Sequence, residues 1–449
     1  MNARESAMKM LVRINEEGVL CHKALRALDG DSLSEKDRAL VTRLVHGTLE
    51  RQLTCDRILE DLTGKPVSRM KAKIRNLMRM TVYQLLFLTQ IPDSAAVNEA
   101  VNLTKKAGYP FLTGFVNGVL RNLVRQIAAA GGAEQYLSET ERKLPGEERI
   151  CFRYAMPAEL TKYYKKNYPD EAEAMFAAFL SEGSFTVRVN RSRGTMRELT
   201  ESLQKDGVAF AEGLLPNTLR MERTGNLART EAYRTGLLSV QDESSVLAGN
   251  ILPLTKDMRV LDLCAAPGGK AVHIADELAV LGGGTVLARD ISSGKCDRIR
   301  ENAERLGLTN ISCEARDAAE YDAASEGQYD LVIADLPCSG LGVIGRKPDI
   351  KYKTTKADIL SLSKLQKDIL VNAVRYVKKG GYLCYSTCTV TKEENGENRR
   401  FLAETGMKAW DFSERVPERF RKRYENGALQ LFPQDGTDGF YVALFRKED

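Results

Sequence analysis

The sequence lacks several features that would assign it to a particular class of protein. It contains no run of about 18 apolar residues, so we expect no transmembrane helix. Its first residues, MNARESAM, lack the apolar core of a signal peptide, which leads us to expect a cytoplasmic protein. No internal repeat or low-complexity tract is present, so nothing indicates a repeat array.

Residues suited to metal binding are also scarce or scattered. The three histidines, His22, His46 and His273, do not cluster in the sequence. The nine cysteines are odd in number and lie in core-like segments, which is typical of reduced thiols rather than of a disulfide framework. Only Cys384 and Cys388 lie close together, and their spacing is not that of a zinc-binding pair. We therefore expect no metal site.

Length and composition set broad limits on what the chain can be. At 449 residues it is long enough for two or three domains. A hydrophobic content of 43% and a charged content of 28% are those of a soluble globular protein. The net charge of +5 is compatible with a nucleic-acid partner but does not by itself indicate one.

The most informative stretch is residues 259–270, which read RVLDLCAAPGGK. A short apolar run, a glycine-containing turn and an amphipathic segment up to Leu281 predict a strand, a tight turn and a helix. Gly268 and Gly269 allow the backbone to turn sharply and to approach a ligand, while the N–H groups of the new helix face the site. This order of elements is how a doubly wound sheet presents a nucleotide.

Three kinds of nucleotide-binding fold use such a turn. A phosphate-binding P-loop needs glycine at position 264 and serine or threonine at 271, where the chain has Cys264 and Ala271. A dinucleotide fingerprint needs Gly-x-Gly-x-x-Gly after the strand, and only an adjacent glycine pair is present. The glycine turn of a sheet that binds S-adenosylmethionine (SAM) remains.

The N-terminal region, residues 1–130, has helical patterning almost throughout. Ser34 and Asp37 can cap one helix, and residues 68–89 place apolar side chains at helical spacing. A last helix is expected over residues 115–127. Because such apolar faces must pack on one another, the sequence predicts an all-α bundle.

A basic stripe lies on the polar side of segment 68–89, where it could follow an RNA backbone. Its members are Arg69, Lys71, Lys73, Arg75 and Arg79. An ordinary solvated helix face is the alternative interpretation. We take Arg69 and Lys73 as candidate RNA contacts.

A charged, glycine-containing stretch over residues 131–150 reads as a linker. Residues 151–235 then predict a small α/β unit with a helical segment at 158–180, a strand at 184–190, a helix at 195–205 and a strand at 218–222. Its arginines are candidate phosphate contacts, with an ordinary exposed surface as the alternative. They are Arg188, Arg191 and Arg193.

The C-terminal region, residues 236–449, alternates strands and helices. Expected strands are 259–264, 284–290, 310–315, 329–335, 381–386 and 439–445, and expected helices are 269–280, 293–306, 361–377 and 393–404. This order predicts an α/β fold, with a mostly parallel sheet covered by helices on both faces. Ligands of such sheets bind outside the carboxyl ends of the strands.

Chemically informative residues occupy those strand ends. Asp290 ends the second strand, where its carboxylate can accept hydrogen bonds from both hydroxyls of a ribose. Cys338 follows the fourth strand and Cys388 ends the fifth, so two cysteines should meet beside the glycine turn. Cys264, Cys296, Cys313 and Cys384 are expected to be small core residues.

The motif LDLCAAPGGK, with the paired motifs Asp-x-Pro-Cys-Ser-Gly and Thr-Cys, closely resembles the RNA cytosine-5 methyltransferases of the RsmB/NOP group, which includes the bacterial Sun/Fmu proteins. The phrases YQL at 83–85, AVNEAV at 96–101 and FVNGVLR at 115–121 resemble the NusB-like helical domain at the front of Sun/Fmu proteins. Residues 151–235 similarly resemble the RRM-like subdomain that precedes the catalytic sheet in this family. The resemblance therefore implies a class I SAM-dependent methyltransferase domain with a Rossmann-like fold, which follows a NusB-like helical bundle in the chain.

The resemblance also implies roles for particular residues. Cys388 would be the nucleophile and Cys338 would assist product release, whereas DNA cytosine-5 enzymes attack with their Pro-Cys cysteine. Asp335 would hold and activate the cytosine, and Lys270 would contact or polarise it. The residues expected at the cofactor are Cys264, Ala265, Ala266, Pro267, Gly268, Gly269, Lys270, Asp290, Asp317 and Asp335.

The chemistry explains why such an enzyme needs cysteine. The C5 carbon of cytosine is a poor nucleophile, and a thiolate that adds to C6 makes it enamine-like and able to attack a sulfonium methyl group. The resemblance implies a monomeric enzyme that acts on 16S ribosomal RNA with SAM. A transfer RNA substrate and a non-catalytic role in antitermination or assembly remain the alternatives. Leu336 stands where the family often has alanine, which affects the shape expected of the pocket.

Overall fold

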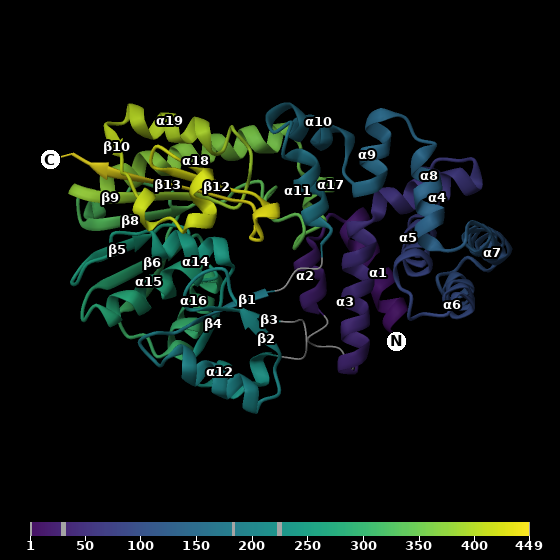
Figure 1. The fold of residues 1–449 in the computed structure, drawn as a ribbon, viewed down its shortest axis with the longest axis horizontal. Coiled ribbons are helices and arrows are strands. Elements are labelled where there is room, and N and C mark those ends of the chain that lie inside the picture. Colours follow the sequence, from purple (N-terminus) through teal and green to yellow (C-terminus); the bar gives the residue numbers. More distant parts are fainter. Residues whose placement is uncertain (1, 28–32, 182–184, 222–226, 449) are drawn as a thin grey trace. The chain divides into compact units, whose positions relative to one another are not determined.

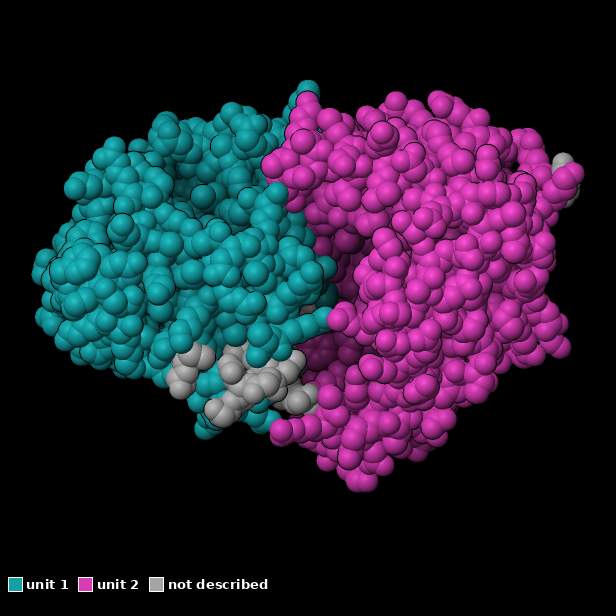
Figure 2. Space-filling model, turned by 180° about the vertical axis from the view of Figure 1, so that it is seen from behind, with its two compact units in different colours: residues 1–181, 344–353 teal, residues 182–343, 354–449 magenta. Residues whose placement is uncertain are grey.

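The computed structural model describes residues 2–27, 33–181, 185–221 and 227–448. The chain divides into two compact units, coloured separately in Figure 2. Unit 1 comprises residues 1–181 and 344–353, and unit 2 comprises residues 182–343 and 354–449.

Unit 1 is built from helices (Figure 1). They are α1 (Ala3–Glu16), α2 (Cys21–Arg26), α3 (Glu35–Glu50), α4 (Gln52–Thr63), α5 (Ala72–Phe87), α6 (Asp93–Lys106), α7 (Thr113–Ala130), α8 (Ala133–Arg142), α9 (Gly146–Tyr154), α10 (Ala158–Asn167), α11 (Ala172–Phe179) and α17 (Ile350–Lys353), with the 3-10 turns η2 (Val67–Arg69) and η3 (Pro110–Leu112). The predicted all-α bundle is confirmed. The Ser34 side chain accepts a hydrogen bond from the Asp37 N–H at 3.1 Å, which caps α3 as expected.

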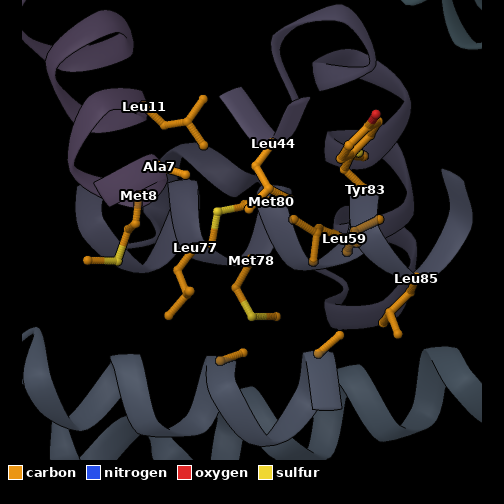
Figure 3. Close-up of a cluster of buried hydrophobic side chains, with 14 of the residues drawn as sticks. Ala7, Met8, Leu11, Leu44, Leu59, Leu77, Met78, Met80, Tyr83 and Leu85 are labelled. Carbon is orange, nitrogen blue, oxygen red and sulfur yellow. The ribbon is translucent and has the colours of Figure 1, made fainter. Parts of the chain in front are cut away.

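Helix α5 lies at the centre of unit 1. It buries side chains around most of its circumference, as a helix surrounded by other helices must. Its residues Leu77 and Met80 pack in one core with Leu11 of α1 and Leu44 of α3 (Figure 3). At Gly47 of α3, an added Cβ would lie 1.9 Å from the Tyr83 ring, so α3 and α5 can approach this closely only with glycine there.

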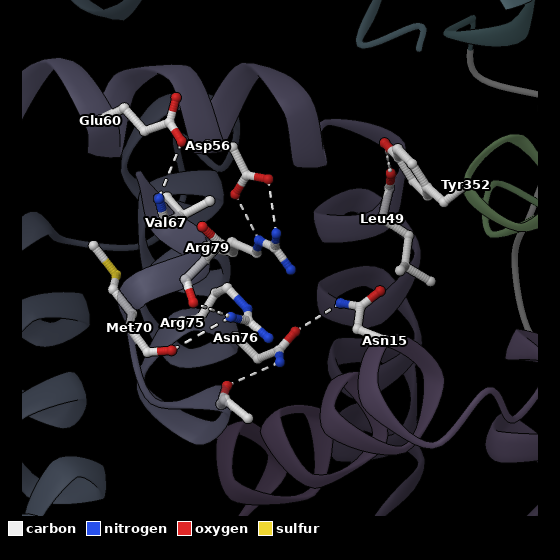
Figure 4. A network of polar contacts seen from close by, with 12 residues as sticks. Asn15, Leu49, Asp56, Glu60, Val67, Met70, Arg75, Asn76, Arg79 and Tyr352 are labelled. Carbon is white, nitrogen blue, oxygen red and sulfur yellow. Dashed lines mark hydrogen bonds and ion pairs between the residues drawn. The ribbon is translucent and has the colours of Figure 1, made fainter. Parts of the chain in front are cut away.

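The basic stripe predicted along α5 is only partly exposed. Arg79 is buried, and its guanidinium donates two hydrogen bonds, of 2.6 and 2.7 Å, to the Asp56 carboxylate (Figure 4). Arg75 pairs with Glu16 at 2.6 Å. The prediction of an RNA-binding stripe is therefore wrong for these two arginines, because carboxylates distant in sequence neutralise them. The exposed members are Arg69, Lys71 and Lys73.

The predicted linker over residues 131–150 is helical, which corrects that prediction. Gly131 and Gly132 have φ angles of +89° and +135° and end α7, but the chain then continues into α8 and α9. Tyr136 and Leu144 belong to the core of unit 1. The glycine pair is therefore the C-terminal cap of a helix within the bundle.

The helical segment expected at 158–180 is interrupted and lies in unit 1. Pro169 cannot continue α10, and the chain resumes as α11. By their contacts, both helices belong to unit 1.

A short segment from the middle of the chain, residues 344–353, also belongs to unit 1. Within it, the Asp349 carboxylate accepts a hydrogen bond from the Cys21 N–H at 3.0 Å. The Lys351 ammonium donates to the Glu50 carbonyl at 2.8 Å, and the Tyr352 hydroxyl donates to the Leu49 carbonyl at 2.7 Å (Figure 4). These contacts fix the segment to α2 and to the end of α3.

Unit 2 contains a small antiparallel sheet with strand order β2-β3-β1-β4. Its elements are β1 (Phe185–Val189), α12 (Met196–Lys205), β2 (Phe210–Glu212), β3 (Thr218–Met221), η4 (Leu227–Arg229), α13 (Glu231–Arg234) and β4 (Leu238–Val240). Thr195 and Glu198 form a capping box at the start of α12. The predicted small α/β subdomain is confirmed.

Arg188 on β1 was predicted to contact RNA, and the structure contradicts this. Its side chain is buried, and Nη1 donates to Asp276 at 2.5 Å and to the Val189 carbonyl at 2.9 Å. The alternation along the strand directs Arg188 inward, where it neutralises a buried carboxylate of α15.

The two neighbouring arginines differ from Arg188. Arg191 pairs with Glu277 at 2.6 Å, and its side chain is 40% exposed. Arg193 is exposed and donates to the Thr235 carbonyl at 3.2 Å. Both remain reachable from solvent.

The large sheet of unit 2 has nine strands in the order β11-β12-β13-β9-β8-β5-β6-β7, with β10 paired to β13. The strands are β5 (Arg259–Asp262), β6 (Thr285–Asp290), β7 (Ile311–Ala315), β8 (Tyr329–Asp335), β9 (Val377–Thr387), β10 (Met407–Ala409), β11 (Tyr424–Glu425), β12 (Ala428–Leu431) and β13 (Phe440–Lys447). The part from β9 to β7 is parallel, and the strands from β13 to β11 are antiparallel. The predicted mostly parallel sheet is confirmed.

Helices cover both faces of this sheet (Figure 1). They are α14 (Glu243–Asn250), α15 (Gly269–Val280), α16 (Ser293–Leu306), α18 (Lys356–Tyr376) and α19 (Gly396–Glu404), with the 3-10 turns η5 (Ala323–Ser325), η6 (Ser413–Arg415), η7 (Glu418–Arg423) and η8 (Pro433–Asp435). Successive residues of β8 alternate between two cores, with Leu331 and Ile333 beside α14, α15 and α16, and Val332 beside α18 and α19. Because both faces of β8 are buried, its sequence is a nearly continuous apolar run.

Candidate active site at the carboxyl ends of the strands

The glycine turn connects β5 to α15. Its backbone is held by the Gly268 N–H, which donates to the Ala265 carbonyl at 2.7 Å, and by the Ala265 N–H, which donates to the Arg289 carbonyl at 2.8 Å. Gly268 has a φ of +106°, a conformation that favours glycine. Around Gly269, an added Cβ would meet nothing within 4 Å, so space beside the start of α15 is open to a ligand.

Asp290, at the end of β6, lies against this turn. Its Oδ2 accepts a hydrogen bond from the Ala266 N–H at 2.9 Å. Its Oδ1 accepts from the Ile291 N–H at 2.8 Å and from the Lys295 ammonium at 2.7 Å. The Lys295 side chain is 49% exposed, whereas the Asp290 side chain is 5% exposed.

Asp317 follows β7, as the sequence predicts. Its Oδ1 accepts a hydrogen bond from the Ala319 N–H at 2.9 Å, which fixes the local turn. The neighbouring Arg316 N–H donates to the Asp290 carbonyl at 2.9 Å. Asp317 and Asp290 thus lie on adjoining strand ends of one sheet edge.

Asp335, at the end of β8, and Lys270, at the start of α15, form an ion pair. The Lys270 ammonium lies 2.6 Å from Oδ2 of Asp335, and the Ser386 hydroxyl donates to Oδ1 at 2.7 Å. Burial opposes the charge of Lys270, but the Asp335 carboxylate outweighs it and raises the pKa of the ammonium. The Asp335 side chain remains 32% exposed, so this ion pair is accessible to a substrate.

Cys338 and Cys388 are brought together, as their positions at neighbouring strand ends predict. Their Sγ atoms lie 3.4 Å apart, which is a contact between two thiols rather than a bond. The hydrogen bond with Cys388, and then burial, raise the pKa of the Cys338 thiol well above its usual value. The charge of an ionised Cys388 is the smallest of the influences that raise the pKa of the Lys270 ammonium.

The two cysteine loops also approach each other through their backbones. The Gly342 N–H donates to the Cys388 carbonyl at 3.1 Å. An added Cβ at Gly342 would lie 2.8 Å from the Cys388 carbonyl oxygen and 2.0 Å from that of Gly439, which precedes β13. This close approach explains the glycine four residues after Cys338.

Sequence reasoning did not select Asp262, the last residue of β5. Burial, followed by the charge of Asp335, raises the pKa of this carboxyl to about 7. Its neighbours Cys264 and Cys384 are sulfur-containing side chains whose pKa values burial also raises. Asp262 lies within the motif LDLCAAPGGK, so its position was visible in the sequence, but its buried surroundings were not.

Among the residues that the structure describes, no group of three or more histidine, cysteine, aspartate or glutamate side chains could hold a metal ion. Within the same residues, no helix combines the length and apolar character needed to cross a membrane. Arg188 is buried behind α15 and takes no part in the site.

Comparisons with known proteins agree with this geometry. Residues 250–446 match the family described as 16S rRNA methyltransferase RsmB/F, residues 1–125 match the NusB family, and residues 156–228 match the ferredoxin-like domain of RsmF/B-like methyltransferases. The chain is 35% identical over 454 residues to the probable ribosomal RNA small subunit methyltransferase B of Bacillus subtilis, covering 100% of this chain and 99% of the relative. The chain belongs to the RsmB/F family of ribosomal RNA methyltransferases.

Further relatives extend the same result. The ribosomal RNA small subunit methyltransferase B of Proteus mirabilis is 31% identical, with 100% of this chain and 99% of the relative covered. Among solved structures, PH0851 has a TM-score of 0.79 at 23% identity, covering 100% of this chain and 99% of that one. NSun6 from Pyrococcus horikoshii, solved with SFG, has a TM-score of 0.58 at 22% identity, covering 65% and 98%. At these identities the solved structures support the fold.

Family membership confirms the predicted family and cofactor. The protein is a SAM-dependent methyltransferase that acts on RNA, with a NusB-like helical region and a ferredoxin-like subdomain ahead of the catalytic sheet. The residues present fit the cofactor, because the open space at Gly269 and the acceptor on Asp290 lie at one sheet edge.

Proposed function

We propose that this enzyme methylates C5 of a specific cytosine in 16S ribosomal RNA, and that Cys388 is the nucleophile. The observation that carries the proposal is the 3.4 Å contact between the sulfur atoms of Cys388 and Cys338 at the strand ends that also bear Asp335 and Lys270. Methylation of a nitrogen or a ribose hydroxyl needs no cysteine nucleophile, whereas activation of a pyrimidine C5 does.

The reaction starts with the thiolate of Cys388. Its sulfur forms a bond to C6 of cytosine, and the electron pair displaced from the C5–C6 double bond makes C5 nucleophilic. SAM supplies the methyl group as an electrophile. A water molecule then takes the C5 proton, and the electron pair of that C–H bond re-forms the C5–C6 double bond as the C6–S bond breaks and its electron pair leaves with sulfur as the thiolate. The Lys270 ammonium, raised in pKa by Asp335, favours the anionic sulfur.

Cys338 is suited to a different role. Its raised pKa keeps its proton in place at neutral pH, and its Sγ lies within hydrogen-bonding distance of Cys388. A protonated thiol in this position donates to the Cys388 sulfur as that sulfur leaves C6. Cys338 therefore assists release of the methylated RNA.

Asp335 and the cofactor residues complete the assignment. With its side chain 32% exposed, Asp335 holds the amino edge of cytosine and stabilises the protonated base while Lys270 stays paired to it. Asp290 holds the ribose of SAM, Asp317 its adenine amino group, and the backbone from Cys264 to Gly269 borders the cofactor.

The roles of the two cysteines are tested by trapping the covalent adduct. Cys388→Ala should lose turnover and form no protein–RNA adduct that survives a denaturing gel. Cys338→Ala should accumulate such an adduct when SAM and RNA are supplied, because attack proceeds and release is slowed. The opposite pattern, an adduct with Cys388→Ala and none with Cys338→Ala, would assign the nucleophile to Cys338.

The RNA substrate and the domain boundaries form a second part of the proposal. We assign residues 1–130 to a helical RNA-binding domain, residues 151–235 to the small α/β subdomain and residues 236–449 to catalysis in a monomeric enzyme. Exposed Arg69, Lys73, Arg191 and Arg193 are its candidate phosphate contacts. Mapping 5-methylcytosine in 16S ribosomal RNA and in transfer RNA, with and without the protein, separates the two possible substrates.

A further inference from the structure

Glu394 lies in the segment that follows Cys388, and its side chain is completely buried. Its Oε1 accepts hydrogen bonds from the Ser339 N–H at 2.8 Å and from the Gln366 side chain at 3.1 Å. Its Oε2 accepts from the Ser339 hydroxyl at 2.5 Å and from the Thr391 hydroxyl at 2.6 Å. These four donors use the roughly four lone-pair positions of a carboxylate.

The donors to Glu394 come from both sides of the cysteine pair. Ser339 directly follows Cys338, and its hydroxyl also lies 2.8 Å from the hydroxyl of Thr389, which directly follows Cys388. A single buried carboxylate therefore ties the backbone next to one cysteine to the segment that begins at the other.

Gln366 extends this connection to the residue before Cys338. Its Nε2 donates both to Glu394 and to the Pro337 carbonyl, at 2.9 Å. The Pro337 carbonyl and the Ser339 N–H, on either side of Cys338, are thus both linked to the Glu394 cluster. Gln366 belongs to α18, which packs against the sheet and gives the cluster a rigid support.

We propose that Glu394 is a positioning residue that holds the Cys338 loop against the Cys388 segment and so sets the distance between the two sulfur atoms. This inference rests on the proposed cysteine chemistry. Glu394 is not itself a general base, because its oxygens are already occupied by donors and its side chain does not reach solvent.

The hydrogen-bond pattern distinguishes two substitutions at this position. In Glu394→Gln, the amide oxygen can take the place of Oε1 and accept from the Ser339 N–H and the Gln366 side chain. The amide nitrogen can take the place of Oε2 and donate to the hydroxyls of Ser339 and Thr391, because a hydroxyl can accept as well as donate. Glu394→Ala removes all four contacts. Positioning should therefore be retained largely in Glu394→Gln and lost in Glu394→Ala.

The first measurement needs no RNA. A diazene oxidant converts the two thiols to a disulfide, as the sulfurs lose two electrons and two protons and the diazene is reduced to a hydrazine. The formation rate of the Cys338–Cys388 disulfide, followed by mass spectrometry of the linked peptides, reports how often the sulfurs meet. Glu394→Ala should form it about tenfold more slowly than the wild type, and Glu394→Gln at nearly the wild-type rate.

The second measurement is steady-state methylation by the full-length variants. Glu394→Ala should lower kcat by up to about 100-fold, with little change in KM for SAM, because misplacement of a reacting group by about 1 Å has effects of this size. Glu394→Gln should recover most of kcat. Ser339→Ala, which keeps the Ser339 N–H contact, should fall between them and provides the same test if Glu394→Ala does not fold.

Ser363→Ala is the matched control. The Ser363 hydroxyl donates to the backbone carbonyl of Glu393 at 2.8 Å, so this variant removes a buried hydrogen bond from the same segment without touching the Cys338 loop. It should leave both measurements unchanged.

Disulfide formation in folded Glu394→Ala or Ser339→Ala as fast as in Ser363→Ala would overturn the proposal. If the cysteine chemistry itself were wrong, Cys338→Ala would give no RNA adduct, while the disulfide rates would still report on positioning.

Discussion

The Nη1 atom of Arg188 lies 2.5 Å from the Oδ2 atom of Asp276, and both side chains are buried. Arg188 belongs to β1 of the small sheet and Asp276 to α15, the helix that begins at the glycine turn. The Asp276 carboxylate also accepts from the Arg191 and Ser192 N–H groups, at 3.0 and 2.7 Å. The small sheet is thus joined to the helix that begins at the glycine turn.

Breaking this pair should destabilise unit 2. Arg188→Met leaves Asp276 buried without its main counter-charge, and removal of one partner of a buried ion pair typically lowers stability by about 3 to 5 kcal/mol. The urea midpoint of unfolding should therefore fall clearly. Arg193→Met, a substitution at an exposed neighbour, is the control and should change the midpoint little. Equal midpoints for the two variants would contradict a stabilising role for the pair.

Asp290 provides a prediction about the cofactor. Asp290→Ala should weaken SAM binding by about 1 to 3 kcal/mol, the scale of hydrogen bonds lost from a charged acceptor. Titration calorimetry on the folded variant measures the change directly. Asp297→Ala replaces an exposed carboxylate of α16 and should leave SAM affinity as in the wild type. Unchanged affinity in Asp290→Ala would remove this residue from the site.

Local patterns in the sequence predicted much of the fold. Strand β8 and helix α16 have the predicted limits, Tyr329–Asp335 and 293–306, because continuous apolar character and helical periodicity are properties of short segments. The positions of Asp290, Cys338 and Cys388 followed from one topological rule, since parallel strands end at one edge of the sheet.

The errors about charged residues arose where a partner lies far away in the sequence. Arg79 and Arg188 looked like surface cations, but Asp56 and Asp276 bury and neutralise them. Charge alone does not reveal such a partner. Glu394 was missed for the same reason, because its contact with Ser339 spans 55 positions. The sequence around Glu394 has only the charged residues that are common at the start of a helix.

Asp262 leads to a prediction about pH. Burial, and then the charge of Asp335, raise its pKa in the folded protein to about 7, compared with about 3.9 for an unfolded chain. Between these values the folded state holds a proton that the unfolded state has released, so stability falls as pH rises from about 4 to about 7. Above the folded-state pKa the loss is complete.

The test compares Asp262→Asn with the wild type. The amide resembles the protonated acid in size and carries no charge, so the thermal midpoint of Asp262→Asn should decline less between pH 5 and pH 8 than that of the wild type. Asp368→Asn, at an exposed position of α18, controls for the loss of a carboxylate and should keep the wild-type profile. Parallel profiles for Asp262→Asn and the wild type would show that Asp262 does not titrate in this range.

The basic surface of unit 1 is best tested by point substitution, because the structure argues against deleting the N-terminal region. Residues 344–353 donate to the carbonyls of Leu49 and Glu50, so a deletion would remove the partners of a segment that follows the Cys338 loop.

Arg69→Ala and Lys73→Ala change exposed side chains and leave those contacts in place. If both contact phosphates, each substitution should weaken RNA binding and reduce the slope of log affinity against log salt by about 0.7 to 0.9. Lys162→Ala, at a lysine of α10 that is 59% exposed, is the control and should leave the slope as it is. RNA filter binding from low to moderate salt measures the slope for all three variants. If the slopes of Arg69→Ala and Lys73→Ala equal that of the control, Arg69 and Lys73 form an ordinary solvated surface.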